Sequence, residues 1–536
     1  MRKINWKTVG IYSVWVIIIA LLVYSRFINL SWGLPYPMHP DERNMAVAVQ
    51  SLSCNISDLR QCGNPHFFAY GQFPLYISYI GVFLMKFFDG DLGTPISFQE
   101  AVFSLRTISA LVSVLTVFVM IGITNTLLKK DKKKKSLIFH IPFLMLVFTF
   151  SPVFIQFSHF GTTESLLILF YSLIVYYSLL YIRNKIHDSR FLVFGSILCG
   201  LSLATKVSTA IYLIIPFTAF FLRHKKKAIV FTGLLLFFSA VLFILFSPHT
   251  IISFNEFFAS MRYESGVALG QPEVFYTRQF AGTVPILFQM IHVFPYALGW
   301  PVFLLGVLGI LGLSWKEKEL YFLRFSFFVV FLPNAFMYAK WTRFIAPAFP
   351  LMMIFAVLFL LRLRIPRFLL YVVSLILLIP GIAFLSVYKN PDVRFQATDW
   401  INKNIPYGAR ILSETANVVD IPLGNANYRP VSFNFYDLDE DEKLRKTLPV
   451  LIVGADYIIV PSRRIFKNHP GKTYPLLNKY YKRLFSGELG FREVVKFTSY
   501  PRITILGKKI VEFPDEDAEE TWTVFDHPVI RIYSKK

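Results

Sequence analysis

Charged residues and cysteines are scarce in this chain of 536 residues. Only 16% of the residues are charged, against about 25% in ordinary soluble domains, which excludes a wholly water-soluble protein of this size. There are 3 cysteines and no Cys-x-x-Cys pair, so zinc or redox chemistry through paired cysteines is not expected. Acidic residues are also few, 33 against 55 Lys and Arg, which leaves a net charge of +22.

Apolar residues take the place of the missing charges. They make up 55% of the chain, and the mean hydropathy is +0.52. They come in blocks close to the ~20 residues that cross ~30 Å of hydrocarbon, so we predict a mainly α-helical membrane protein with about eleven transmembrane helices. The predicted spans are residues 9–30, 101–128, 136–157, 163–182, 191–205, 207–222, 228–247, 297–314, 325–339, 344–361 and 368–387. Only Thr205 and Lys206 separate the fifth and sixth blocks, so one long kinked segment is the alternative there.

The basic residues are distributed unevenly between the two sides of the membrane. With the N-terminus inside, the short inner loops are 1–7, 129–135, 183–190, 223–227, 316–324 and 362–367. They hold 22 Lys and Arg and 4 Asp and Glu, whereas the rest of the chain before residue 389 holds 10 basic and 10 acidic residues. This bias is the positive-inside pattern. It predicts a multi-pass protein of the plasma membrane with a cytoplasmic N-terminus, and it explains the net charge without a nucleic-acid partner.

Two predicted outer loops are long, and the composition changes after residue 388. The first loop, 31–100, contains an apolar stretch at 73–88 that we predict to be an interfacial helix. The second is 248–296. Residues 389–536 hold no spanning block and predict an external, soluble α/β domain after the transmembrane domain 1–388. Its expected elements are helices at 394–404 and 474–485 and strands at 409–414, 457–460, 494–498 and 529–533.

Carboxylates at the outer ends of the spans are the first candidates for chemistry, because charge is costly next to hydrocarbon. Asp41 and Glu42 follow the first span in the run 39–43, and a carboxylate there could act as a general base. The alternative for Asp41 is a helix N-cap. Glu164 begins the fourth span on the same predicted face, where a lone glutamate is often only a partner of the helix dipole.

Cations on the same face are the second set of candidates. They are Lys206, Arg262, Lys340 and Arg343, and the alternative for each is snorkelling to lipid headgroups. The turn at 340–344 carries two of them with a Trp, and an Arg fork can grip phosphate oxygens bidentately. Carboxylates and cations on one face indicate a lipid-phosphate substrate. His249 is a weaker candidate, and Asp41, Glu164 and His249 are candidate ligands for a divalent metal ion, the one cofactor left open.

Several motifs resemble the GT-C glycosyltransferases, in particular the group of protein O-mannosyltransferases and aminoarabinose transferases. HPDERNMAVA at 39–48 looks like the acidic motif of their first outer loop. SPVFIQFSHFGTTES at 151–165 is similar to the end of their third helix and the acidic start of the fourth, with Glu164 where Asp is usual. KWTRFIAPAFPLMM at 340–353 resembles the Arg-plus-proline start of a late helix. QFPLY at 72–76 lacks one proline of their interfacial helix.

The resemblance implies a GT-C arrangement of helices and transfer of a sugar from a polyprenyl-phosphate carrier. The acceptor would be a hydroxyl of a protein or lipid on the outer face of the membrane. Asp41 would be the base and Glu42 would position it. Glu164 would give electrostatic or metal support, and Lys340 and Arg343 would hold the leaving phosphate.

Two other functions fit parts of the pattern. A transporter or lipid flippase is the alternative of a different class, but transporters usually place charges and broken helices near the bilayer midplane. An oligosaccharyltransferase-like enzyme is the second, but that family normally carries a Trp-Trp-Asp motif, and this chain has no Trp-Trp pair.

Two further features lie outside the predicted site. Cys54 and Cys62 share the external first loop, where disulfides are permitted, and we predict a bridge between them. Asp526 and His527 are interpreted as a turn at the start of a strand, with a structural rather than a functional role, and the role of 389–536 is left open.

Overall fold

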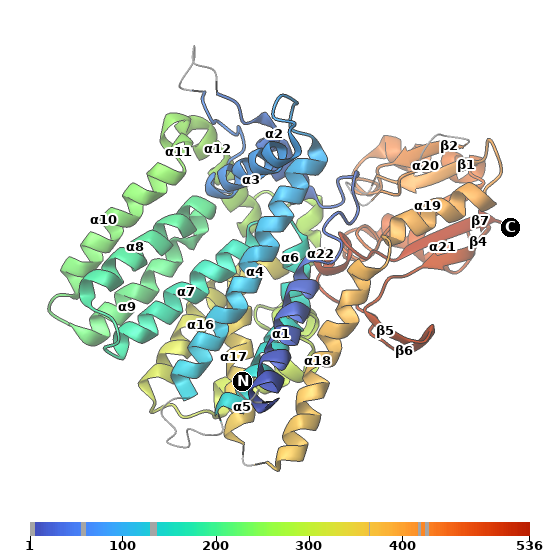
Figure 1. Cartoon of the computed structure of the whole chain (residues 1–536). Coiled ribbons are helices and arrows are strands. Elements are labelled where there is room, and N and C mark those ends of the chain that lie inside the picture. Colours follow the sequence, from blue (N-terminus) through green and yellow to red (C-terminus); the bar gives the residue numbers. More distant parts are fainter. Residues whose placement is uncertain (1–5, 55–60, 129–136, 364, 416–419, 424–427) are drawn as a thin grey trace.

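The chain folds into a bundle of long helices followed by a smaller part that contains a sheet (Figure 1). The computed structural model describes residues 6–54, 61–128, 137–363, 365–415, 420–423 and 428–536. Most of the first predicted inner loop, 1–7, and all of the second, 129–135 with Lys132, lie outside the described residues.

The apolar blocks form helices, and further helices fill the two long predicted outer loops. Up to residue 269 the helices are α1 (Trp6–Phe27), α2 (Pro40–Ser51), α3 (Phe73–Asp89), α4 (Phe98–Leu128), α5 (Leu137–Thr149), α6 (Pro152–His159), α7 (Glu164–Ile182), α8 (Asp188–Thr205), η1 (Val207–Leu213), α9 (Ile214–Arg223), α10 (Ala228–Phe246), α11 (His249–Ile252) and α12 (Phe254–Leu269). The remaining helices of the bundle are η2 (Phe275–Phe280), α13 (Leu287–His292), α14 (Phe294–Leu298), α15 (Trp300–Gly312), α16 (Lys318–Phe336), η3 (Thr342–Ile345), α17 (Ala348–Arg362) and α18 (Arg367–Lys389).

The number of membrane spans is lower than predicted when length is the criterion. Within the described ranges, six helices are long and apolar enough to cross a membrane, and a seventh results if α5 and α6, bent by 55°, count as one. Each predicted block is helical, but three of them form shorter helices, in η1 with α9, in α15 and in α17. The predicted number of about eleven spans is therefore not confirmed. The chain is extended at Lys206, which separates α8 from η1.

Predicted inner loops meet at one end of the bundle. Arg362 pairs with Glu317 at 2.7 Å, and Arg183 lies 3.7 Å from Glu319. These contacts join three loops that the Lys and Arg bias assigns to the same side. Helices α2, α3 and α12 gather at the opposite end of the bundle (Figure 1).

The C-terminal part is built on a five-stranded sheet with the order β2-β1-β3-β7-β4. Strand β1 is parallel to β2 and β3, and β7 is antiparallel to β3 and β4. Its elements are α19 (Val393–Asn404), β1 (Arg410–Glu414), β2 (Arg429–Phe433), α20 (Glu442–Gly454), β3 (Tyr457–Val460), α21 (Pro475–Phe485), β4 (Phe491–Phe497), β5 (Arg502–Ile505), β6 (Lys508–Glu512), α22 (Glu520–Thr523) and β7 (Ile530–Lys535). All six predicted elements are present, whereas β2, α20, β5, β6 and α22 were not predicted.

Helices cover both faces of this sheet because alternate strand residues point to opposite sides. Ile411 and Ile459 pack in one apolar cluster with α19. Their neighbours Leu412 and Ile458 pack in another with α21.

Candidate functional site

Helix α2 presents the carboxylate of Asp41 toward the C-terminal part. The ring Nδ1 of His39 accepts hydrogen bonds from the backbone N–H groups of Asp41 (3.2 Å) and Glu42 (3.4 Å), so His39 is the N-cap. Burial, with the positive charge of Arg343, lowers the pKa of His39, which keeps the ring neutral and able to accept these bonds. The alternative in which Asp41 caps α2 is wrong, and its carboxylate serves another contact.

That contact is an ion pair between Asp41 and Arg343 of η3. Both side chains are about one-fifth exposed, 19% and 20%. The guanidinium also lies over the ring of Trp341, 4.8 Å from its centre. Burial lowers the pKa of Arg343 to about 10, so the group is still a cation at neutral pH. The Asp41 carboxylate and the Arg343 guanidinium therefore form an ion pair where α2 and η3 come together. A bound anion could replace Asp41 as the partner of Arg343.

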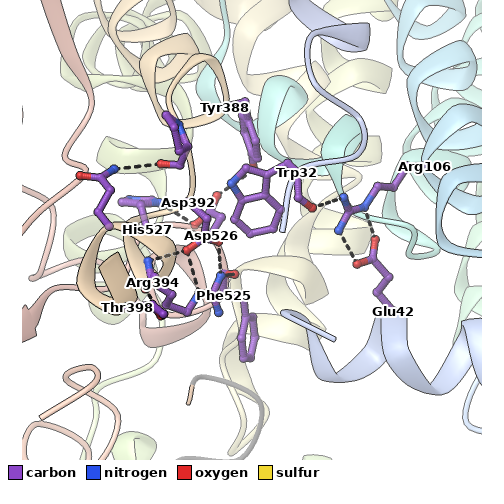
Figure 2. A network of polar contacts seen from close by, with 12 residues as sticks. Trp32, Glu42, Arg106, Tyr388, Asp392, Arg394, Thr398, Phe525, Asp526 and His527 are labelled. Carbon is purple, nitrogen blue, oxygen red and sulfur yellow. Dashed lines mark hydrogen bonds and ion pairs between the residues drawn. The ribbon is translucent and has the colours of Figure 1, made fainter. Parts of the chain in front are cut away.

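Glu42 is fully occupied by structural partners. Its two oxygens accept hydrogen bonds from Arg106 at 2.7 Å each, and one also accepts from the backbone N–H of Gly161 at 2.7 Å. Arg106 donates further bonds to the carbonyls of Leu30 and Trp32 (Figure 2). A Cβ on Gly161 would lie 3.0 Å from the Glu42 oxygen. Glu42 thus fixes α2 against α4 and is suited to positioning Asp41.

A polar network attaches the C-terminal part next to this motif (Figure 2). The ring of Trp32 lies between the guanidinium groups of Arg106 and Arg394, at 5.5 and 5.6 Å. Arg394 is fully buried, pairs with Asp392 at 2.8 Å and donates to the carbonyl of Phe525 at 2.7 Å. A buried charge requires such partners. The loop before α2 and the C-terminal part are therefore held in one fixed arrangement.

The predicted turn at Asp526 and His527 belongs to this network. The imidazole lies between Asp526 (2.5 Å) and Asp515 (2.8 Å), and Asp526 also accepts from Tyr388 and Gln156. Burial alone would lower the pKa of His527, but the two carboxylates outweigh it and raise that pKa to about 10. The doubly paired imidazolium is a structural junction between the helices and the C-terminal part.

A cavity of about 290 Å³ opens beside the Asp41–Arg343 pair. This volume is at the lower end of the range of ligand clefts, about 300–1,000 Å³. Its walls come from α2, α12, η2 and η3 and from the C-terminal part. The charged residues that line it are Asp41, Arg43, Glu264, Arg343, Arg464 and Glu520. Cations and carboxylates thus face one space between the helices and the C-terminal part.

Arg464 and Glu520 were missed by the sequence analysis. Both are buried, and the Arg464 Nε lies 3.4 Å from a Glu520 oxygen. Within the part of the chain that the structure describes, the Nε and Nη1 atoms of Arg464 have no hydrogen-bond partner. Burial raises the pKa of Glu520. No local motif marks either residue, because only the docking of the C-terminal part brings them to Asp41.

Glu164 lies at a second, smaller cavity that also touches Arg343. This cavity measures about 20 Å³, room for about one water molecule, and Thr342 and Gln156 help to line it. One Glu164 oxygen is buried and has no hydrogen-bond partner among the described residues. Arg343 therefore stands between Asp41 on one side and Glu164 on the other.

Lys206 lies on the Glu164 side of the site. Its ammonium group lies over the rings of Tyr70 (5.1 Å) and Phe344 (5.2 Å). Phe344 directly follows Arg343 in η3, so Lys206 contacts the segment that carries Arg343. Such cation–π contacts hold an ammonium group in place while leaving it charged.

Three other predicted residues lie elsewhere. Lys340 is buried and donates to the carbonyl of Tyr338, and it does not line either cavity. Arg262 is exposed and lines a separate cavity of about 470 Å³. His249 is hydrogen-bonded to the carbonyl of Cys62 at 3.0 Å. Lys340, Arg262 and His249 therefore do not line the cavity beside Asp41 and Arg343.

The predicted metal ligands are not brought together either. Across the described residues, no group of three or more His, Cys, Asp or Glu side chains is placed to hold a metal ion. His249 is occupied at the first loop, where its ring is hydrogen-bonded to the carbonyl of Cys62, the disulfide partner of Cys54. The predicted disulfide is confirmed. The set of Asp41, Glu164 and His249 is not assembled.

Comparisons with known proteins agree on the fold. Residues 74–230 match the family model of the protein O-mannosyl-transferase TMEM260 N-terminal domain. The structure is similar to ArnT from Cupriavidus metallidurans bound to undecaprenyl phosphate, with a TM-score of 0.53 and 11% identity over 98% of both chains. It is also similar to the Archaeoglobus fulgidus oligosaccharyltransferase in the apo form, with a TM-score of 0.50 and 13% identity over 88% of this chain and 72% of that one. No curated protein sequence matches the chain.

The resemblance to GT-C glycosyltransferases is therefore confirmed at the level of the fold. The chain is a multi-pass membrane protein with this architecture. The matched family model spans α3 to the start of α10, which include Glu42's partner Arg106 and the candidates Glu164 and Lys206.

Proposed function

We propose that the protein is a membrane glycosyltransferase. It transfers a sugar from a polyprenyl-phosphate-linked donor to a hydroxyl of a protein or lipid acceptor. The observation that carries the proposal is the Asp41–Arg343 pair, which lines a polar cavity between the helices and the C-terminal part. The fold supports it, and so does the matched O-mannosyl-transferase family model.

The two arginines of the cavity provide the phosphate site. Among the described residues, Arg343 is held by the Asp41 carboxylate and the Trp341 ring, and the Nη1 atom of Arg464 has no hydrogen-bond partner, while its Nε lies 3.4 Å from Glu520. A planar guanidinium can hold a phosphate bidentately. When the donor phosphate binds Arg343, the ion pair between Arg343 and Asp41 breaks. The Asp41 carboxylate is then free to act as the base.

The reaction is then a direct displacement. The bond between the anomeric carbon and the phosphate oxygen breaks, and the acceptor oxygen forms a new bond to that carbon. Asp41 takes the hydroxyl proton, and polyprenyl phosphate leaves with the electron pair. The sugar passes through an oxocarbenium-like state, as in glycosidases. Glu164 lines the small cavity that Arg343 also lines and has one oxygen without a hydrogen-bond partner among the described residues, and its negative charge stabilises the developing positive charge.

The cavity faces the side of the membrane that carries the C-terminal part. The Lys and Arg bias of the loops supports a plasma-membrane protein with a cytoplasmic N-terminus. On that assignment the C-terminal part and the acceptor lie outside the cell.

The test is donor consumption by the purified protein in nanodiscs, with a panel of polyprenyl-phosphate sugars and a membrane extract as the acceptor source. Mass spectrometry measures released polyprenyl phosphate. Arg343→Lys keeps the positive charge but loses the planar guanidinium that can hold a phosphate bidentately. Loss of one charge-assisted hydrogen bond, about 1.5–3 kcal/mol, corresponds to an increase in the donor KM of about ten- to a hundredfold.

The matched control is Arg362→Lys, because Arg362 makes a similar half-buried pair with Glu317 at the opposite end of the bundle. It should leave turnover unchanged. A transporter would move lipid without consuming any donor, and that result for the whole panel contradicts the proposal.

A further inference from the structure

The β5–β6 hairpin stands apart from the five-stranded sheet. Within the described residues, its two strands pair only with each other. Figure 1 shows it beside α18 rather than beside the sheet, and the backbone N–H of Arg502 donates to the Ser386 hydroxyl near the end of α18 at 3.0 Å. An isolated two-stranded hairpin is marginally stable in water, so α18 is its support.

The hairpin exposes apolar side chains at its tip. Ile505 is 55% exposed, Leu506 99% and Ile510 62%. Lys508 and Lys509 lie between them and are also exposed. Apolar side chains flanked by lysines that can extend toward water are typical of segments at a membrane interface.

The tip residue is also unfavourable for the turn itself. Leu506 has φ = 49° and Gly507 has φ = 78°. Two successive left-handed residues form a tight hairpin turn that favours Asn-Gly, and a bulky residue rarely adopts positive φ. A leucine at the most exposed position of this turn indicates that the tip requires an apolar side chain.

The position along α18 puts the hairpin at membrane depth. An apolar cavity of about 730 Å³ lies between the hairpin and α18. It is lined by Ile505 and Ile510 of the hairpin and by Ile376 and Ile379 of α18. Residues 368–389 of α18 form a candidate span. Ile376 lies thirteen residues before its end, about 20 Å along the helix axis. Since the hydrocarbon layer is ~30 Å thick, the cavity extends well below the end of the span.

We propose that the β5–β6 hairpin inserts its tip into the membrane leaflet nearest the C-terminal part. Leu506 lies at the boundary between headgroups and acyl chains, and the cavity behind the hairpin holds a lipid acyl chain. The depth is limited, because open strand edges cannot be hydrogen-bonded in the hydrocarbon layer. The partner is thus the bilayer surface, at the depth of about 5–10 Å typical of interfacial segments.

The test uses single fluorophores in liposomes. Cys54 and Cys62 are bridged and Cys199 is the free cysteine, so Cys199→Ala gives a background for labelling. NBD is attached at Leu506→Cys in the full-length protein. The controls are Tyr407→Cys, 85% exposed on the C-terminal part, and Leu375→Cys, 64% exposed on α18. Quenchers are nitroxide lipids with shallow or deep labels and aqueous iodide.

The expected result is that the probe at Leu506 loses most of its emission with the shallow nitroxide lipid and less with the deep one. The probe at Leu375 should respond mainly to the deep label, and that at Tyr407 mainly to iodide. Iodide quenching at Leu506 equal to that at Tyr407 overturns the proposal. Protection of Leu506 from both iodide and nitroxide lipids also overturns it, because the tip would then be covered by protein.

Discussion

Replacing Asp41 by Asn separates its catalytic role from its structural one. The change keeps the size of the side chain and leaves the cap of α2 intact, because His39 caps through the backbone N–H groups. What is lost is the ion pair with Arg343, between two groups that are about one-fifth exposed. Such a pair contributes at most about 1 kcal/mol to stability. The melting temperature should therefore change by only a few degrees.

The effect on transfer should be much larger. General-base catalysis contributes about 10²–10⁴-fold in rate, which equals about 3–5 kcal/mol at ~1.36 kcal/mol per tenfold change. Turnover is measured as polyprenyl phosphate released in nanodiscs, with donor binding and thermal unfolding of the same preparation as controls. Glu520→Gln is the matched variant, because Glu520 is another carboxylate that lines the cavity. Asp41→Asn turnover within threefold of wild type would refute Asp41 as the base.

Three further predictions concern the architecture. Glu42→Gln leaves the buried Arg106 without its charged partner, so the free energy of unfolding should fall by about 3–5 kcal/mol; a melting temperature equal to that of wild type contradicts this. Because the pKa of His527 is raised in the folded protein, its protonated form stabilises the fold fully below about pH 6.5, and this stabilisation is lost as the pH rises through about 10. The melting temperature should therefore fall over that pH range in wild type and change less with pH in His527→Asn. A cysteine at Lys132 should resist an impermeant maleimide added to intact cells while one at Tyr407 reacts; the reverse pattern would overturn the topology.

The local signals in the sequence were reliable where one segment determines its own structure. Period and length predicted the helices of the eleven apolar blocks, because an apolar block must form a helix to satisfy its backbone in hydrocarbon. The same signals predicted six elements of the C-terminal part. The predicted number of spans is not confirmed, because proline and glycine at positions such as Pro152 and Gly299 divide blocks into shorter helices. The strands β5 and β6 were missed because they are short and lie outside the main sheet.

The candidate site shows a similar division. Asp41, Glu164 and Arg343 stand in motifs that the sequence displays, since charge next to an apolar block is costly and therefore conspicuous. The contacts of the site residues were not visible in the sequence. Glu42 is bound by Arg106, and the ion pair between Asp41 and Arg343 joins residues about three hundred positions apart.

The sequence by itself determined that this is a helical membrane protein, which end of the bundle carries the polar motifs, and that Cys54 and Cys62 are bridged. These follow from hydropathy, charge bias and a shared loop. Only the tertiary structure decided that Lys340, Arg262 and His249 lie apart from Asp41 and that the C-terminal part supplies Arg464 and Glu520. The physical reason is that a cavity between two packed parts depends on how their surfaces dock, and docking is fixed by long-range contacts such as Arg394 with Phe525.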